Sequence, residues 1–198
     1  MLIYCKDHLH NFIKQTQITP HYVWLEVDKG IFVNMEENLK ICAVYNPPDN
    51  SPYCNKDIFE EISEHMLTWA NSNSAILIVG DLNARTAELS DHEEIDKLDN
   101  TPILSREKIP SKRSNCDKKD NKMGRKLLHL CKSHNLQLLN GRATGDHGGA
   151  LSFFDNREGA SSIDVLIASD PPLPSVKSCC TQTGRTFLTL QNTAKSRP

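Results

Sequence analysis

An acid and an amide follow directly on a short apolar run. The run AILIV at residues 75–79 continues as Gly80-Asp81-Leu82-Asn83. A carboxylate can take a proton from an attacking water, and an amide beside it can donate N–H groups to a phosphate oxygen. The pair therefore suits hydrolysis at phosphorus. The same residue types also form turns, so a turn that only caps the strand is the structural alternative.

The apolar run predicts a central strand, because a strand buried on both faces is hydrophobic throughout. If this strand continues through Gly80, Asp81 and Asn83 point to the same side, since residues i and i+2 of a strand do. Ligand sites gather at the carboxyl ends of strands in α/β sheets. We therefore expect the acid and the amide to share one site at the end of this strand.

Other segments must hold this strand in place. Apolar spacing predicts helices over residues 56–70 and 122–134. Residues rich in β-branched and aromatic side chains predict antiparallel strands at 22–27, 31–33 and 40–45, and further strands at 136–139, 151–154 and 162–168. The opening MLIYCK reads as a chain that begins inside a strand. This order predicts an α+β fold, a layered α/β sandwich.

Composition sets limits on function. The chain has 198 residues and a formal net charge of −2, so we expect one domain that does not grip nucleic acid by charge alone. Residues 106–126, however, hold nine basic and three acidic side chains, a local balance of +6. Arg113 and Lys126 in this segment are candidate contacts to substrate phosphates, and a solvated loop is the alternative reading.

The ends and the cysteines carry further expectations. The domain is expected to cover residues 1–170, and residues 171–198, which lack Asp, Glu and His, are expected to form a divergent, partly disordered or non-native tail. Seven cysteines without a C-x-x-C pair indicate reduced thiols in an intracellular protein, nuclear or cytoplasmic. No apolar run is long enough for a membrane span.

Four stretches in order resemble the endonuclease/exonuclease/phosphatase family, which has the fold of deoxyribonuclease. The resemblance is closest to the endonuclease domain of non-LTR (long interspersed) retrotransposons. The stretches are ICAVYNPPD at 41–49, AILIVGDLNAR at 75–85, NKMGRKLLHLCKSHNLQLLNGRATGD at 121–146 and GGALSFFDNREGASSIDVLIAS at 148–169.

The resemblance implies roles for individual residues. Asp81 matches the acid that activates or orients the attacking water, and Asn83 matches the amide that holds the phosphate. Tyr45 matches a phosphate-contacting tyrosine, and Asp164 matches the aspartate that orients a catalytic histidine. Ser152 stands where a hydroxyl residue, often threonine, contacts the substrate region. The family uses a divalent cation, typically magnesium, and the implied partner is DNA, with no membrane and no obligate protein partner.

The chain departs from the family pattern at both ends. Positions for an asparagine and a metal-binding glutamate would precede residue 1, and a closing Ser-Asp-His would follow Asp164. We therefore assign no metal ligand and expect an incomplete deoxyribonuclease-like domain, truncated at both ends and inactive or nearly so alone. Two alternatives remain: a non-catalytic remnant that binds nucleic acid or protein through the basic segment, and a phosphatase of small molecules.

Overall fold

The computed structural model describes residues 3–32, 35–69, 75–92, 112–155, 159–169, 176–182 and 185–190, the last two ranges as backbone. Some expectations lie outside these residues. They include the end of the strand expected at 31–33, the end of the helix expected at 56–70, and Arg106 and Lys108 of the basic segment.

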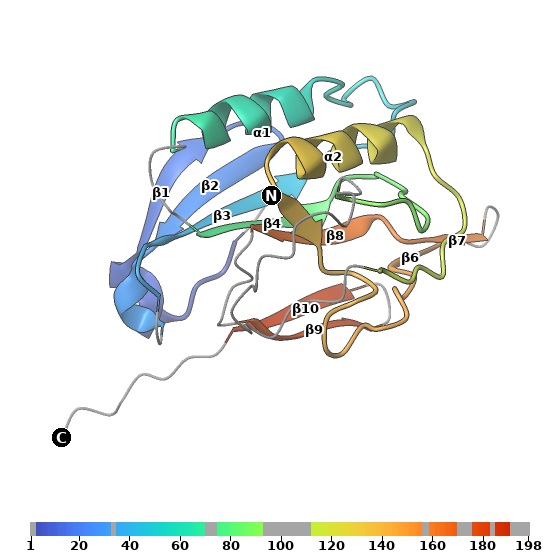
Figure 1. Cartoon of the computed structure of the whole chain (residues 1–198). Helices are drawn as coiled ribbons and strands as arrows, with labels where there is room; N and C mark the ends of the chain where they lie inside the picture. Colours follow the sequence, from blue (N-terminus) through green and yellow to red (C-terminus); the bar gives the residue numbers. More distant parts are fainter. Residues whose placement is uncertain are drawn as a thin grey trace, which may run out of the picture.

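A six-stranded mixed sheet forms the centre of the molecule (Figure 1). Its spatial order is β1 (Ile13–Ile18), β2 (Tyr22–Val27), β3 (Leu39–Tyr45), β4 (Ala75–Asp81), β8 (Asp164–Ser169) and β5 (Leu136–Leu138). β3 and β4 run parallel, and the other neighbouring pairs are antiparallel. β4 thus lies inside the sheet, between strands from both halves of the chain.

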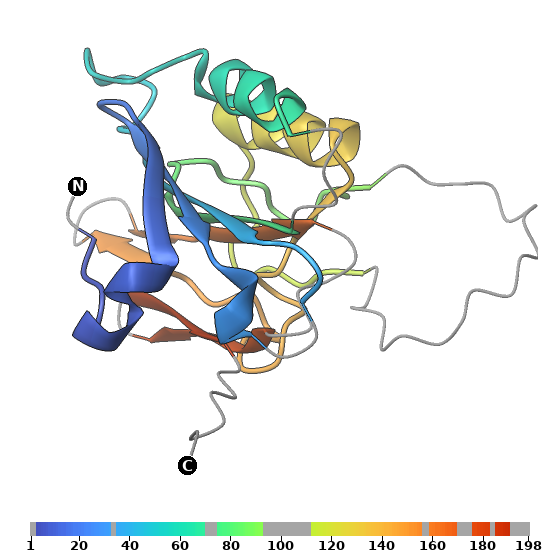
Figure 2. The same ribbon diagram turned by 90° about the vertical axis from the view of Figure 1, so that its left-hand side faces the viewer.

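Two helices, α1 (Ile58–Leu67) and α2 (Lys122–Ser133), lie side by side on one face of the sheet (Figures 1 and 2). The buried side chains of α1 are Ile58, Phe59, Ile62 and Met66, which recur at helical spacing. α2 begins at Asn121, whose side chain accepts a hydrogen bond of 2.7 Å from the Gly124 N–H. Among the residues described, no helix has the length and apolarity to cross a membrane.

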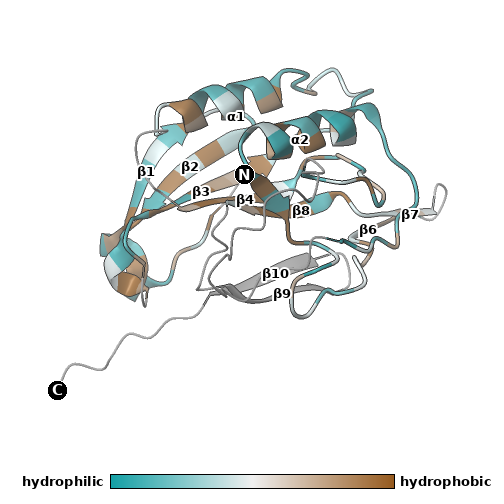
Figure 3. Cartoon of the chain, in the orientation of Figure 1, coloured by the Kyte–Doolittle hydropathy of each residue, from teal (hydrophilic) through white to brown (hydrophobic). Residues whose placement is uncertain are grey.

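Both faces of the central strand are covered, which explains its unbroken apolar run. Ile78 packs under the helices with Trp24 and Ile62. Leu77 faces the opposite side and packs with Leu166 in a second cluster. Figure 3 shows the apolar residues concentrated along these inner strands. The prediction of a central strand is confirmed.

The antiparallel strands expected at 22–27 and 40–45 are confirmed as β2 and β3. The strand expected at 31–33 is wrong at its start, because Lys29–Ile31 form the 3₁₀ turn η2, which the Asp28 carboxylate stabilises by accepting from the Gly30 N–H at 2.6 Å. The expectation of an opening strand is also wrong. Residues 3–6 have no regular structure, a 3₁₀ helix, η1 (Asp7–Phe12), follows, and the first strand is β1.

Two hairpins complete the described chain. β6 (Phe153–Asp155) pairs with β7 (Gly159–Ser161), and β9 (Val176–Gln182) pairs with β10 (Arg185–Leu190). The second hairpin lies on the face of the sheet opposite the helices (Figure 1). Residues 171–198 were expected to form a partly disordered or non-native tail, and the described parts of this segment pair as strands. The strands VKSCCTQ and RTFLTL are rich in Val, Thr, Phe and Leu, which favour extended structure despite the polar composition of the segment.

Candidate active site

Three neighbouring strands bring three of the expected site residues to one edge of the sheet. Tyr45 at the end of β3 is the parallel register partner of Asp81, and Asp81 at the end of β4 is the antiparallel partner of Asp164. Because register partners are adjacent across a sheet, these side chains start from neighbouring backbone positions. Tyr45 is 50% exposed, so its ring is available to a ligand.

Asn83 reaches the same place by a turn rather than by strand alternation. β4 ends at Asp81, and Asn83 has a φ of 48°, in the left-handed region. The Asp81 carboxylate accepts a hydrogen bond of 2.9 Å from the Asn83 N–H, which is the geometry of an Asx turn. The expectation that Asp81 and Asn83 project together from a continuous strand is therefore wrong in its cause. A turn, the alternative that the residue types also allowed, joins the two residues.

Asn46, to which the sequence analysis gave no role, holds the amide of Asn83. The Asn83 Nδ2 donates a 2.9 Å hydrogen bond to the main-chain oxygen of Asn46. The Asn46 side chain is fully buried, accepts from the Asn55 N–H at 2.9 Å and donates to the Asn55 carbonyl at 3.0 Å. Asn46 thus joins the loop after β3 to the loop after β4. Its position directly after Tyr45 was the available signal.

The two carboxylates share an unfavourable electrostatic environment. Burial raises the pKa of Asp81 to about 6, the hydrogen bond from the Asn83 N–H opposes this shift, and the nearby charge of Asp164 adds to it. Burial also raises the pKa of Asp164, against a hydrogen bond from the Ser152 hydroxyl. A carboxylate poised near neutral pH is suited to accept a proton from water.

Ser152 fixes the start of β8 beside Asp164. It is 4% exposed, and its Oγ accepts hydrogen bonds from the N–H groups of Ile163 at 3.1 Å and Asp164 at 3.0 Å. Ser152, a candidate substrate contact from the sequence, thus lies beside Asp164 and binds the main chain that positions this carboxylate.

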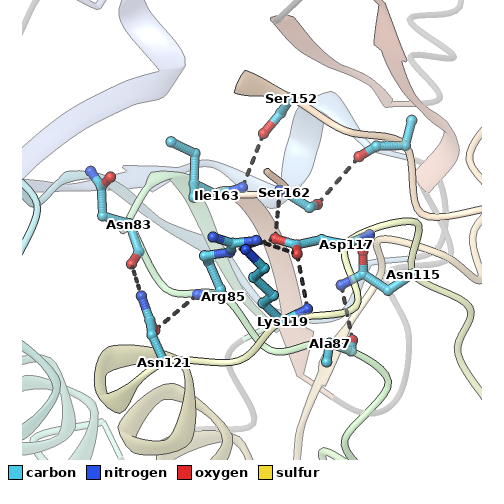
Figure 4. A network of polar contacts seen from close by, with 11 residues as sticks. Asn83, Arg85, Ala87, Asn115, Asp117, Lys119, Asn121, Ser152, Ser162 and Ile163 are labelled. Carbon is cyan, nitrogen blue, oxygen red and sulfur yellow. Dashed lines mark hydrogen bonds and ion pairs between the residues drawn. The ribbon is translucent and has the colours of Figure 1, made fainter. Parts of the chain in front are cut away.

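A second polar network supports the loop that follows Asn83 (Figure 4). Asn121 Nδ2 donates to the Asn83 carbonyl at 2.9 Å, and its Oδ1 accepts from the Arg85 N–H at 3.1 Å. The Arg85 guanidinium forms a two-point contact with Asp117, at 2.8 and 2.6 Å. Asp117 also accepts from the N–H of Ser162, just before β8. The network ties the loops on both sides of the site together.

Close backbone approaches make two glycines necessary here. Gly80 has a φ of 143°, and an added Cβ would lie 1.9 Å from the Val44 carbonyl oxygen on β3. Gly124 lets α2 approach so closely that a Cβ would lie 1.8 Å from the Arg85 carbonyl oxygen. Neither distance is compatible with a side chain, so both contacts depend on glycine.

The structure separates Arg113 and Lys126 from the strand ends. Arg113 is 5% exposed and donates to Thr86 Oγ1 and to the carbonyls of Ala87 and Leu89. Lys126 on α2 donates to Glu60 and to the Lys56 carbonyl on the helix side of the molecule. Of the basic segment, Lys112, Lys119 and Lys122 have no ion-pair partner among the residues described.

The donor set at the strand ends meets the needs of a magnesium ion only in part. Magnesium prefers oxygen ligands and is commonly held by one or two carboxylates together with water and substrate phosphates. Asp81 and Asp164 supply two such carboxylates. Their pKa values are raised, and the positive charge of a nearby cation would lower them. Within the described ranges, no group of three His, Cys, Asp or Glu side chains forms a metal site. The residues therefore fit an ion that is shared with a bound phosphate.

The chain resembles known proteins in sequence and in fold. A family model described as endonuclease-reverse transcriptase matches residues 39–188. Among solved structures, the endonuclease domain of TRAS1, a telomere-specific non-LTR retrotransposon, is similar with a TM-score of 0.51 and 14% sequence identity, which supports a common fold. The alignment covers 86% of this chain and 59% of that one, so the chain spans less than two thirds of that structure. No curated protein matches the sequence.

Proposed function

Because the chain belongs to the endonuclease-reverse transcriptase family, we propose that its strand-end site is the phosphodiester-hydrolysing centre of a DNA endonuclease of retrotransposon origin. The observation that carries the proposal is the meeting of Tyr45, Asp81 and Asp164 on three adjacent strand ends, with Asn83 anchored beside them. These residues supply a base, hydrogen-bond donors and a cation-binding pair within one site.

The residues divide the chemistry between them. Asp81, as a carboxylate, orients the attacking water and accepts its proton. Asn83 has one N–H committed to Asn46, so its second N–H donates to a nonbridging phosphate oxygen. The exposed Tyr45 hydroxyl donates to the same phosphate from the neighbouring strand.

Endonucleases of this family are generally metal-dependent, and Asp81 and Asp164 are the residues that would hold the ion. A bound magnesium would offset the negative charge of the phosphate as it is attacked. Ser152 keeps Asp164 in place through its two main-chain hydrogen bonds. Removal of Ser152 would therefore act on the reaction only through Asp164.

We further propose that this chain by itself is catalytically incomplete. In the family, the residue matched by Asp164 orients a histidine, and none of the described histidines contacts Asp164. The remaining groups would still position the phosphate and the water. The expected result is slow nicking, several orders of magnitude below that of a complete endonuclease.

Chemical rescue tests both the assignment of the hydrolytic site and the proposal that the chain is catalytically incomplete. Supercoiled plasmid is incubated with the chain and magnesium, with and without imidazole as a small stand-in for the histidine that Asp164 does not contact among the described residues. We expect imidazole to increase nicking by the wild type and not by Asp164→Asn, and Asp81→Asn to remove nicking altogether. Nicking that survives Asp81→Asn would come from another site and would overturn the assignment. If the wild type does not nick the plasmid even with imidazole, the hydrolytic function is excluded and only nucleic-acid binding remains as a function.

One observation favours a second candidate function, a non-catalytic nucleic-acid-binding module. Lys112, Lys119 and Lys122 are not neutralised by ion pairs within the described parts of the chain. Such charges bind phosphates with an affinity that falls steeply with salt. Binding of duplex DNA that weakens with salt and is reduced by Lys119→Gln and Lys122→Gln, without any rescued cleavage, would support this function.

A further inference from the structure

A groove of about 500 Å³ opens beside the strand ends, and apart from Tyr45 its lining has no role in the chemistry described above. Its lining combines three rings with three prolines: His21, Tyr45, Tyr53, Pro20, Pro47 and Pro52. Among the residues that the structure describes, no Asp, Glu, Lys or Arg side chain lines it. A surface of flat rings and prolines without a charge suits a flat, uncharged, partly apolar group rather than a phosphate or a metal ion.

Tyr45 places the groove next to the proposed phosphate site. It lines the groove, and it is also the register partner of Asp81. Its N–H donates to the His21 carbonyl at 2.8 Å, which brings the second ring-bearing segment to the same strand end. A ligand bound at Asp81 and Asn83 therefore lies one strand away from the groove.

The groove wall is held in shape before any ligand arrives. Asn46 binds both main-chain polar groups of Asn55, and the same Asn46 holds the Asn83 side chain. Within the loop, the N–H of Ser51 donates to Pro48 at 2.8 Å and that of Tyr53 donates to the Ser51 hydroxyl at 3.2 Å. A preformed wall lowers the entropic cost of binding.

Tyr53 is the side chain best placed to meet a ligand. It is 77% exposed, although it lies on this ordered turn of the loop. Exposed aromatic rings on a rigid support act as stacking platforms for nucleobases, since every base has a π-face. Tyr45 and His21 offer further ring surface in the same groove.

We propose that this groove binds an unpaired nucleobase of the substrate strand, next to the phosphodiester bound at Asp81 and Asn83. The proposal rests on the proposed function, and it narrows the substrate to DNA that is single-stranded or carries an extrahelical nucleotide at the cut site. A paired base exposes only its edges in the grooves of a duplex, so its face reaches Tyr53 only when it leaves the stack. The shared Tyr45 favours a nucleotide over a proline-rich peptide, the other ligand that aromatic grooves take.

The test uses the full chain and oligonucleotides that carry 2-aminopurine, whose fluorescence reports stacking. Affinity is measured without magnesium, so that no cleavage takes part. We expect tighter binding and a larger fluorescence change for a single-stranded or bulged 2-aminopurine than for the same base in a duplex. Tyr53→Ala should weaken that binding by roughly 5- to 150-fold, the range for loss of one stacked base, and Tyr53→Phe should retain it.

The control is Tyr4→Ala, a tyrosine that is 89% exposed and does not line the groove. Equal affinity of the wild type and Tyr53→Ala for every oligonucleotide would overturn the proposal. Displacement of the oligonucleotide by a proline-rich peptide, with no preference for an unpaired base, would instead assign the groove to a peptide. These readouts do not depend on cleavage, so they separate failure of the groove from failure of the proposed endonuclease, which is judged by nicking that depends on Asp81.

Discussion

Asn83 donates a 2.9 Å hydrogen bond to the main-chain oxygen of Asn46, and so the amide at the end of β4 is fixed to the loop that leaves β3. The contact links residues that are 37 positions apart in the chain. Because Asn46 also holds Asn55 in the groove wall, a change at either end of this link affects both the proposed phosphate site and the groove.

Asn46→Ala should lower the free energy of unfolding by about 2–4 kcal/mol. The substitution leaves the part-buried N–H and carbonyl groups of Asn55 without their partner, and a buried group left so costs about 1–3 kcal/mol. Asn46→Asp keeps the acceptor, but it buries a carboxylate and sets one of its oxygens against the Asn55 carbonyl, so it should cost at least as much as the alanine variant. Urea unfolding of the three proteins measures the difference, and equal stability of all three would contradict the role of Asn46.

Gly80→Ala should destabilise the protein by about 3 kcal/mol or more. The added Cβ would meet the Val44 carbonyl oxygen at 1.9 Å, and the φ of 143° is strained for any other residue. Gly148→Ala is the matched control, since its Cβ would meet no atom within 4 Å. Thermal unfolding should show a large drop in Tm for the first variant and nearly none for the second. An equally small drop in Tm for both variants would show that β3 and β4 can move apart to accommodate the added Cβ.

The stability of Asp81→Asn relative to the wild type should depend on pH. Burial raises the pKa of Asp81 from 3.8 to about 6 in the folded protein, so the folded state binds this proton more tightly than the unfolded state does. Ionisation of Asp81 therefore costs stability as pH rises through this interval, and the full cost is present above pH 6.

Asn cannot ionise and can still accept from the Asn83 N–H. The variant should thus gain on the order of 2 kcal/mol at pH 7.5 and almost nothing near pH 3.5. Urea unfolding at the two pH values measures the gain. The same gain at both values would mean that it does not come from the charge.

The sequence did not predict these effects on pH dependence and stability, although it did predict β4, the strand that carries Gly80 and Asp81. The apolar run at 75–79 predicted β4 because burial on both faces leaves a direct trace in composition. β1 was missed because it lies at the edge of the sheet, and its sequence IKQTQI is largely polar and exposed. Asn46 was missed because its partners, Asn55 and Asn83, are distant in sequence, and its place directly after Tyr45 does not reveal them.

The sequence resemblance predicted the family and the fold correctly, and it pointed to the strand ends that meet in the structure. What it could not supply was the way in which they meet. Asp81 and Asn83 are joined by a left-handed turn, a conformation that Gly80-Asp81-Leu82-Asn83 permits but does not require. For Arg113 the local sequence was misleading. Its position in a basic segment suggested an exposed cation, but contacts with residues distant in sequence bury it.

Ser152→Ala should lower the free energy of unfolding by about 1–3 kcal/mol, and Ser152→Thr should lower it much less. The Ser152 hydroxyl accepts from two main-chain N–H groups at the start of β8, and alanine leaves both of them unsatisfied in the interior. Threonine retains the hydroxyl. Hydrogen exchange at Ile163 and Asp164 measures the effect locally, and unchanged protection of both amides in the alanine variant would contradict it.

Asp117→Ala should cost about 2–3 kcal/mol, because it removes the carboxylate that binds Arg85 and leaves the Ser162 N–H without an acceptor. Glu88→Gln, which breaks the exposed ion pair with Lys118, should leave the unfolding midpoint unchanged. Denaturant titration compares the two. A midpoint for Asp117→Ala close to that of Glu88→Gln would show that the network in Figure 4 contributes little.

The order of strands has a consequence for how the protein is made. β8 lies between β4 and β5, and both of these precede it in the chain. A ribosome therefore releases the two flanking strands while the space between them is still empty, and Asp164 reaches Asp81 only when β8 enters that space. Biosynthesis thus couples assembly of the carboxylate pair to one of the last pairing events, so a nascent chain lacks the proposed site until β8 joins the sheet.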